Sequence, residues 1–176
     1  MIAIAGATPA CGSISPGRTA WIAPSSTPSI TAFPPPCSFL TQRVAAGMSG
    51  DTAVSIQADN AAETGSGFVA CIFADARNEA NSVEVQIKRS SDAEEPSTVA
   101  QAVTFFSRGE PVAPFQPFPV PGVGDSALGE ATPGVAFIVF SNGELLVYVG
   151  ASSADVSGTA LRDGVRRLAE VVAAGL

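Results

Sequence analysis

The segment 135–149 constrains the fold of this chain more than any other feature, because apolar side chains run through it on both sides of Asn142-Gly143. Asn-Gly is the strongest short signal for a two-residue type I′ turn between antiparallel strands, and such a turn here pairs Ser141 with Glu144. This pairing directs to one face Ala136, Ile138, Phe140, Leu145, Val147 and Val149, and to the other Val135, Phe137, Val139, Leu146 and Tyr148. Both faces are apolar, so we expect other elements to cover both of them.

Three further segments have strand patterns, namely 53–58, 67–74 and 82–89. In the first, Val54 and Ile56 alternate with polar residues. The second is apolar on both faces, which indicates burial on both sides. The third alternates cleanly between apolar and polar residues, which indicates a strand with one face exposed to water.

Three segments have the pattern of helices, namely 38–47, 95–107 and 158–174. We expect Ser38 to cap the first helix and Gly47 to end it. In the last helix, one apolar stripe contains Leu161, Val165, Leu168 and Val172. Strands and helices together predict an α+β domain, in which two or three helices pack on an antiparallel sheet of about five or six strands.

Composition argues against several classes of function. The chain has no histidine, which removes the commonest general base and the usual zinc ligand. We therefore expect a protein that is not an enzyme, with no catalytic residue, no metal and no cofactor. The alternative is a hydrolase that works without histidine and uses Lys88, the only lysine, as its base. The net charge of −7 argues against nucleic acid as a partner, and the cluster of Arg162, Arg166 and Arg167 is interpreted as the solvated face of a helix.

The N-terminal part of the chain suggests a protein that is secreted or attached to the cell envelope. Residues 1–11 resemble the end of a signal peptide, and Cys11 lies where a lipobox cysteine would be acylated. The alternative is an ordinary terminus of small residues with an incidental cysteine. Residues 12–36 are rich in Pro, Ser and Thr and predict a disordered tether, which leaves residues 37–176 as a single domain. No stretch has the roughly 18 apolar residues of a membrane-spanning helix, so we expect membrane contact only through a lipid anchor.

The three cysteines, Cys11, Cys37 and Cys71, allow three different disulfide pairings. Cys37 enters the first predicted helix and Cys71 lies in the buried strand 67–74. The two can meet if that helix packs on the sheet, and Cys11 is then the odd one. Closing this loop would stabilise the fold by roughly 3–4 kcal/mol. The alternative is a pair of buried free thiols in a cytosolic protein.

Several short motifs resemble an actinobacterial envelope lipoprotein family of unknown function. Pro36-Cys37-Ser38-Phe39-Leu40-Thr41 is similar to the Pro-Cys-x-Leu-Leu-Thr segment that opens the folded domain of that family, with Phe39 where Leu is usual. Cys71-Ile72-Phe73 resembles its second cysteine, and the segment 122–127 resembles its Gly-Leu-Gly-Asp-x-Ala stretch. The resemblance covers about residues 33–176 in order and spacing. It implies a lipid-anchored or secreted protein outside the cytoplasm, with a Cys37–Cys71 disulfide and no established activity.

Two aromatic residues, Phe115 and Phe118, are the candidate binding residues. They lie in a Pro-rich connection, which predicts a stiff extended loop or a sheet edge because proline cannot donate a hydrogen bond to a sheet. The two rings either close the edge of the core or form a lip for an apolar ligand or a partner. Asp125, in the segment 122–127, is expected to cap a turn before the hairpin. The sequence thus predicts a non-catalytic domain that binds an envelope protein or a small apolar ligand.

Overall fold

The computed structural model describes residues 33–59, 68–91, 96–108 and 114–176. Predictions for Cys11 and for nearly all of the tether fall outside these residues. The strands are β1 (Ser55–Asp59), β2 (Phe68–Asp75), β3 (Asn78–Arg89), β4 (Gln116–Phe118), β5 (Ser126–Ala131), β6 (Val135–Asn142) and β7 (Leu145–Ser152). The helices are a short 3₁₀ turn, η1 (Pro36–Ser38), and the α-helices α1 (Gln42–Ser49), α2 (Val99–Ser107) and α3 (Gly158–Gly175).

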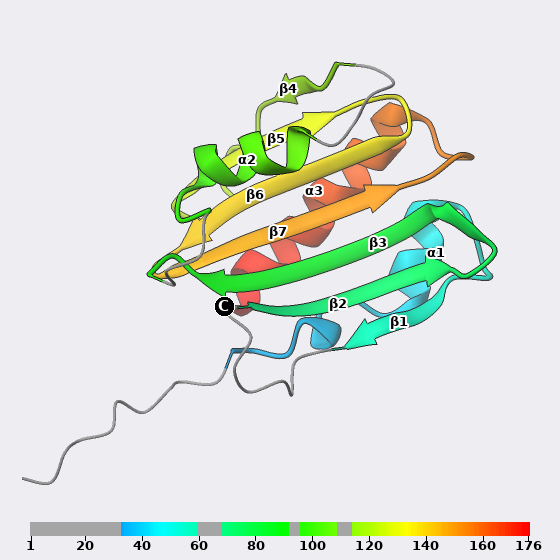
Figure 1. Ribbon diagram of the computed structural model, residues 1–176, viewed down its shortest axis with the longest axis horizontal. Coiled ribbons are helices and arrows are strands. Elements are labelled where there is room, and N and C mark those ends of the chain that lie inside the picture. The colour runs from blue at the N-terminus through cyan, green and yellow to red at the C-terminus, as the bar shows by residue number, and fades with distance from the viewer. Residues whose placement is uncertain (1–32, 60–67, 92–95, 109–113) are drawn as a thin grey trace, which may run out of the picture. The chain divides into compact units, whose positions relative to one another are not determined.

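The predicted α+β class is confirmed, but the predicted strand number was too low. The described residues form one antiparallel sheet of seven strands in the order β1-β2-β3-β7-β6-β5-β4 (Figure 1). The two further strands are β4, in the connection for which an extended loop or a sheet edge was expected, and β5, which no strand pattern predicted. The first has only three residues, with Pro117 at its centre, and the second is Ser-Ala-Leu-Gly-Glu-Ala. Such residues are depleted in strands, so tertiary contacts impose the extended conformation.

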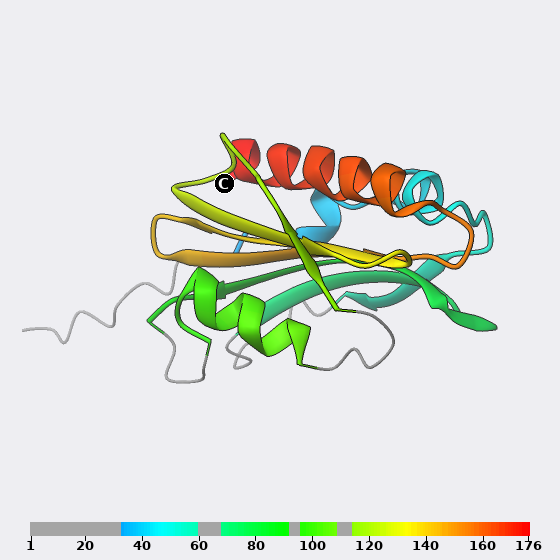
Figure 2. The same cartoon turned by 90° about the horizontal axis from the view of Figure 1, so that it is seen from above.

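Helices cover both faces of the sheet. In Figure 2, α1 and α3 lie on one side of the strands and α2 lies on the other. The larger core lies between the sheet and α1 and α3, where Leu161, Val165, Leu168 and Val172 form the predicted buried stripe of α3. A smaller apolar cluster lies beneath α2 and contains Val99, Ala102, Val103, Phe137, Val139 and Leu146. The expectation that both faces of the β6–β7 hairpin are covered is therefore confirmed.

The β6–β7 hairpin differs from its prediction by two residues in register. Asn142 pairs with Leu145, so Gly143 and Glu144 form the turn and Ser141 does not pair with Glu144. Gly143 has a φ of +58° and Glu144 has no positive φ, which matches a turn with glycine at its first central position rather than a type I′ turn. A slip of two residues keeps every side chain on its original face, whereas a slip of one would invert them. The predicted faces are therefore correct although the predicted pairing is wrong.

The segment 122–125 is hydrogen-bonded to this hairpin. The backbone N–H of Asp125 donates to the carbonyl oxygen of Ser141 at 2.8 Å, and its carboxylate Oδ2 accepts from the backbone N–H of Gly143 at 2.8 Å. Gly124 has a φ of +57°, and a Cβ there would lie 2.2 Å from the carbonyl oxygen of Ser141. Asp125 thus holds the turn of the hairpin itself, and the neighbouring glycine permits the close approach.

Helix α1 begins and ends later than predicted. Thr41, in an extended conformation, caps it by accepting the N–H of Val44, and Gly50 ends it in the left-handed conformation. Ser38 instead lies in η1, after a run of prolines that cannot extend a regular helix. The shift matters for the surface, because Val44 is not part of the core but is 37% exposed.

Candidate functional site

A disulfide joins Cys37 in η1 to Cys71 in β2. Their Cα atoms are 5.1 Å apart and the residues are separated by 34 positions. Cys71 is fully buried, while Cys37 packs at the margin of the larger core. The predicted pairing is confirmed, and it fixes the segment that leads into α1 against the sheet.

A groove runs between α1 and α3, on the side of these helices that faces solvent. Its volume is about 440 Å³, and it is lined by Phe39, Arg43, Val44, Gly47, Met48, Gly164, Arg167, Leu168 and Val171. This volume lies within the range of about 300–1,000 Å³ that is typical of ligand sites. The groove is open to solvent along its length rather than enclosed.

The floor and walls of the groove are mainly apolar. Met48 and Leu168 are buried at its floor, whereas Val171 is 56% exposed and Val44 is also partly exposed, so both present apolar atoms to water. A Cβ placed on Gly47 would meet no atom within 4 Å, so α1 presents bare backbone to the groove. A Cβ on Gly164 would lie 3.3 Å from the Met48 side chain. The helices α1 and α3 therefore approach each other closely at the floor of the groove.

The charges of the groove are all positive, although the chain as a whole has a net charge of −7. Arg43 lies on α1 and Arg167 on α3, and no described residue forms a hydrogen bond or an ion pair with either guanidinium. The neighbouring Arg166, in contrast, is paired with Glu170 at 3.0 Å. Two unpaired guanidinium groups beside an apolar surface favour a ligand that carries both apolar and anionic groups.

Sequence reasoning did not find this groove. The sequence pattern placed Arg167 on a solvated helix face, and local patterns contain no information that brings α1 beside α3. No acidic residue precedes Asp51, so the segment that forms α1 contains none, but this absence extends over the whole N-terminal part of the chain and does not single out the groove.

Phe115 and Phe118 lie on opposite faces of the sheet. The Phe115 ring packs on the α2 side, with its centre 5.3 Å from the centre of the Phe137 ring. Phe118 packs against the larger core on the other side, and a Cβ on Gly129 would lie 2.5 Å from its ring. The Pro-rich connection thus forms a sheet edge, which is one of its two expected conformations, with Phe118 in β4 and Phe115 just before it. The two rings do not form one shared lip, and a binding role for either stays a prediction.

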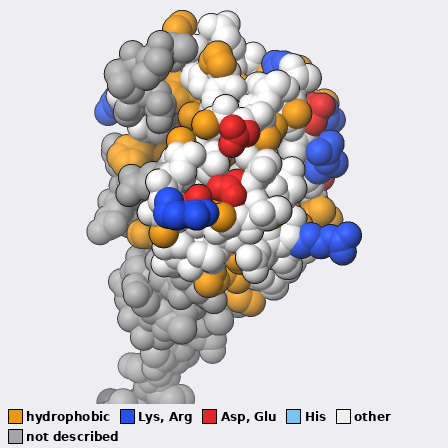
Figure 3. All heavy atoms as spheres, turned by 90° about the vertical axis from the view of Figure 1, so that its right-hand side faces the viewer, with side chains coloured by type: hydrophobic (Ala, Val, Ile, Leu, Met, Phe, Trp, Pro, Cys, Tyr) orange, Lys and Arg blue, Asp and Glu red, His pale blue; other side chains and the backbone are white. Residues whose placement is uncertain are grey.

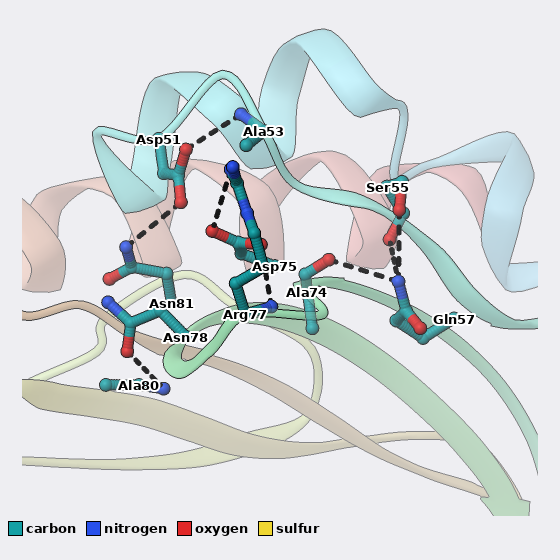
Figure 4. Close-up of polar contacts among 10 residues, drawn as sticks. All are labelled: Asp51, Ala53, Ser55, Gln57, Ala74, Asp75, Arg77, Asn78, Ala80 and Asn81. Carbon is teal, nitrogen blue, oxygen red and sulfur yellow. Dashed lines mark hydrogen bonds and ion pairs between the residues drawn. The ribbon is translucent and has the colours of Figure 1, made fainter.

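A polar cluster lies around the turn between β2 and β3 (Figure 4). The Asp75 carboxylate accepts from the backbone N–H of Arg77 at 2.9 Å and from its Nε at 3.3 Å, and these contacts lower the pKa of Asp75. The buried Asn81 donates to the Asp51 carboxylate at 3.1 Å and accepts from the backbone N–H of Ala154 at 3.1 Å. These groups use their hydrogen bonds to join strands and loops, so the cluster is a structural one.

The surface at this end of the domain is mixed in character. Figure 3 shows it with positive, negative and small apolar patches interspersed among uncharged groups. No single kind of side chain dominates it among the described residues, so it offers no clear binding surface.

The described part of the chain contains neither a metal-binding cluster nor a membrane-spanning helix. Within it, no group of three or more His, Cys, Asp or Glu side chains could hold a metal ion. The helices that the structure describes include none of the length and apolarity required to cross a membrane. Comparison of the chain with protein-family models, with curated proteins and with solved structures finds no match.

Proposed function

We propose that this protein is a non-catalytic binding domain that acts outside the cytoplasm, and that it holds an envelope protein or a small apolar ligand in the groove between α1 and α3. The groove carries the proposal. It combines exposed apolar side chains, such as Val171, with unpaired guanidinium groups, such as that of Arg43. A partner that carries both apolar and anionic groups would cover these side chains and pair with the guanidinium groups.

The location outside the cytoplasm has separate support. The Cys37–Cys71 disulfide favours an oxidising compartment, because cytosolic thiols are kept reduced. The sequence resemblance to actinobacterial envelope lipoproteins points the same way, and acylation of Cys11 would supply a membrane anchor. The proposal therefore covers a lipid-anchored form and a secreted form.

The location is tested by the intact mass of the protein from its native host, before and after reduction, with labelling of free thiols. We expect two thiols to appear only on reduction, and a gain of a diacylglyceryl group on a processed Cys11 in the anchored form. Three free thiols on an unprocessed chain would contradict a location outside the cytoplasm.

The binding surface is tested by a photo-crosslinking amino acid at Val171, introduced in the native host. The matched control places the same amino acid at Glu144, an exposed residue in the β6–β7 turn. We expect adducts, with protein or with lipid, that depend on the Val171 position. Adducts that are absent at Val171, or that are the same at Glu144, would contradict binding in the groove.

A further inference from the structure

We infer that the partner in the α1–α3 groove is a short amphipathic helix of another protein, with an apolar stripe and acidic residues on both sides of it. This inference rests on the proposed function, since it names the class of partner that the same groove would bind. The shape of the groove, the bare backbone at Gly47 and the placement of the two arginines support it.

The dimensions of the groove suit a helix of about two turns. The residues of α3 that line it run from Gly164 to Val171, and at 1.5 Å per residue they extend over about 10 Å. Apolar residues at positions i, i+4 and i+7 of a partner helix span the same length. An amphipathic helix that lies in a groove between two helices is a common mode of recognition.

The bare backbone at Gly47 favours a bulky partner that approaches α1 closely. Glycine inside a helix is less favourable than alanine by roughly 0.5–1 kcal/mol. No contact within the described part of the chain requires glycine at position 47, because a Cβ there would meet nothing within 4 Å. Its effect is to leave room on the groove wall for another backbone or a large side chain.

The charges determine which helix would fit. Arg43 lies on one wall and Arg167 on the other, so carboxylates are favoured on both sides of the partner's apolar stripe. The N-terminal segment of this chain cannot supply them, because residues 1–32 contain no Asp or Glu. A fatty acid fits less well, because it has one carboxylate and because an open groove cannot enclose most of an acyl chain.

The test uses the full-length oxidised protein and a display library of helix-forming peptides with leucine at i, i+4 and i+7 and random flanking positions. We expect the selected peptides to carry Asp or Glu at the flanks. The best peptide is then resynthesised with lysine at these positions, and binding of both peptides is measured by fluorescence anisotropy at low and high salt.

Variants connect the binding to the groove. We expect the double variant Arg43→Gln, Arg167→Gln to weaken the acidic peptide about tenfold, which is about 1.4 kcal/mol. Gly47→Phe fills the groove and is expected to abolish binding. Arg108→Gln is the matched control, because Arg108 is an exposed arginine at the end of α2 on the other face of the sheet. Circular dichroism and thermal unfolding check that each variant is folded.

The outcomes separate this inference from the proposed function. Selection of peptides without acidic flanks, equal binding of the lysine peptide, or unchanged affinity in the double arginine variant would overturn the inference. Palmitate is measured in parallel. If palmitate binds and Gly47→Phe blocks it, while no acidic peptide is selected, the partner class is wrong but the groove still binds a ligand. If no probe binds and Val171 gives no specific adduct, both proposals fail.

Discussion

Reduction of the Cys37–Cys71 disulfide should lower the free energy of unfolding by about 4 kcal/mol at 25 °C. The bridge closes a loop whose ends are separated by 34 positions. The chain-entropy relation for a loop of this length gives a loss of roughly 13 cal/mol/K for the unfolded chain, which is about 4 kcal/mol. Small domains have a total stability of roughly 5–15 kcal/mol, so this bridge accounts for a large share of it.

The assay is equilibrium unfolding in urea of the oxidised protein, of the reduced protein, and of the double variant Cys37→Ala, Cys71→Ala. The reduced protein keeps both sulfur atoms, so its loss reports the loop alone. The double alanine variant also loses the packing of the fully buried Cys71, so it should be somewhat less stable than the reduced protein.

Cys11→Ser provides the matched control, since it removes a cysteine without opening the bridge. Its stability should equal that of the wild type to within about 0.5 kcal/mol. A loss of less than about 1 kcal/mol on reduction would refute the argument from loop closure. It would show that the unfolded chain is already compact between the two cysteines.

Three further predictions concern the backbone and the polar cluster. Gly124→Ala should destabilise the domain by about 2–4 kcal/mol in thermal or urea unfolding, and Gly143→Ala by only about 1 kcal/mol. Both glycines have a positive φ, but of the two only Gly124 lacks space for a Cβ. Equal losses in the two variants would contradict the clash between a Cβ at position 124 and β6. Gly47→Ala should raise the free energy of unfolding by about 0.5–1 kcal/mol, since the added methyl group contacts nothing. A decrease would show that other atoms occupy the space beside Gly47. The contacts with Arg77 lower the pKa of Asp75, so their stabilising effect is present above about pH 4 and is lost as pH falls through the lowered pKa. Asp75→Asn should therefore weaken the dependence of the unfolding free energy on pH on the acid side. An unchanged pH dependence would contradict a stabilising role of the Asp75 carboxylate.

The elements with strong local patterns could be predicted from the sequence. The alternation in β3 and the apolar stripe of α3 lie where their periods place them, and Val83, Val85 and Ile87 are fully buried. The pattern failed at the sheet edge. In the segment 53–58, the alternating residues Val54 and Ile56 differ in burial. Val54 is fully buried, whereas Ile56 is 50% exposed in the edge strand β1, whose register shifts beyond this residue.

The candidate site could not be predicted in the same way. The cysteine pair was found because its two residues lie in recognisable elements that could pack together. The groove depends instead on where α1 begins and ends, at Thr41 and Gly50, and on the packing of α1 beside α3. The two candidate binding residues, Phe115 and Phe118, lie on opposite faces of the sheet, because the edge of the sheet passes between them.

The sequence by itself determined which faces of the strands and helices are apolar, because side-chain direction follows from the period of each element. It also determined the candidate disulfide and the absence of histidine chemistry. Only the tertiary structure decided the register of β6 and β7, the inclusion of β4 and β5 in the sheet, and the placement of Arg43 and Arg167 in the lining of one groove. These features depend on contacts between residues far apart in the chain, and local periodicity carries no information about such contacts.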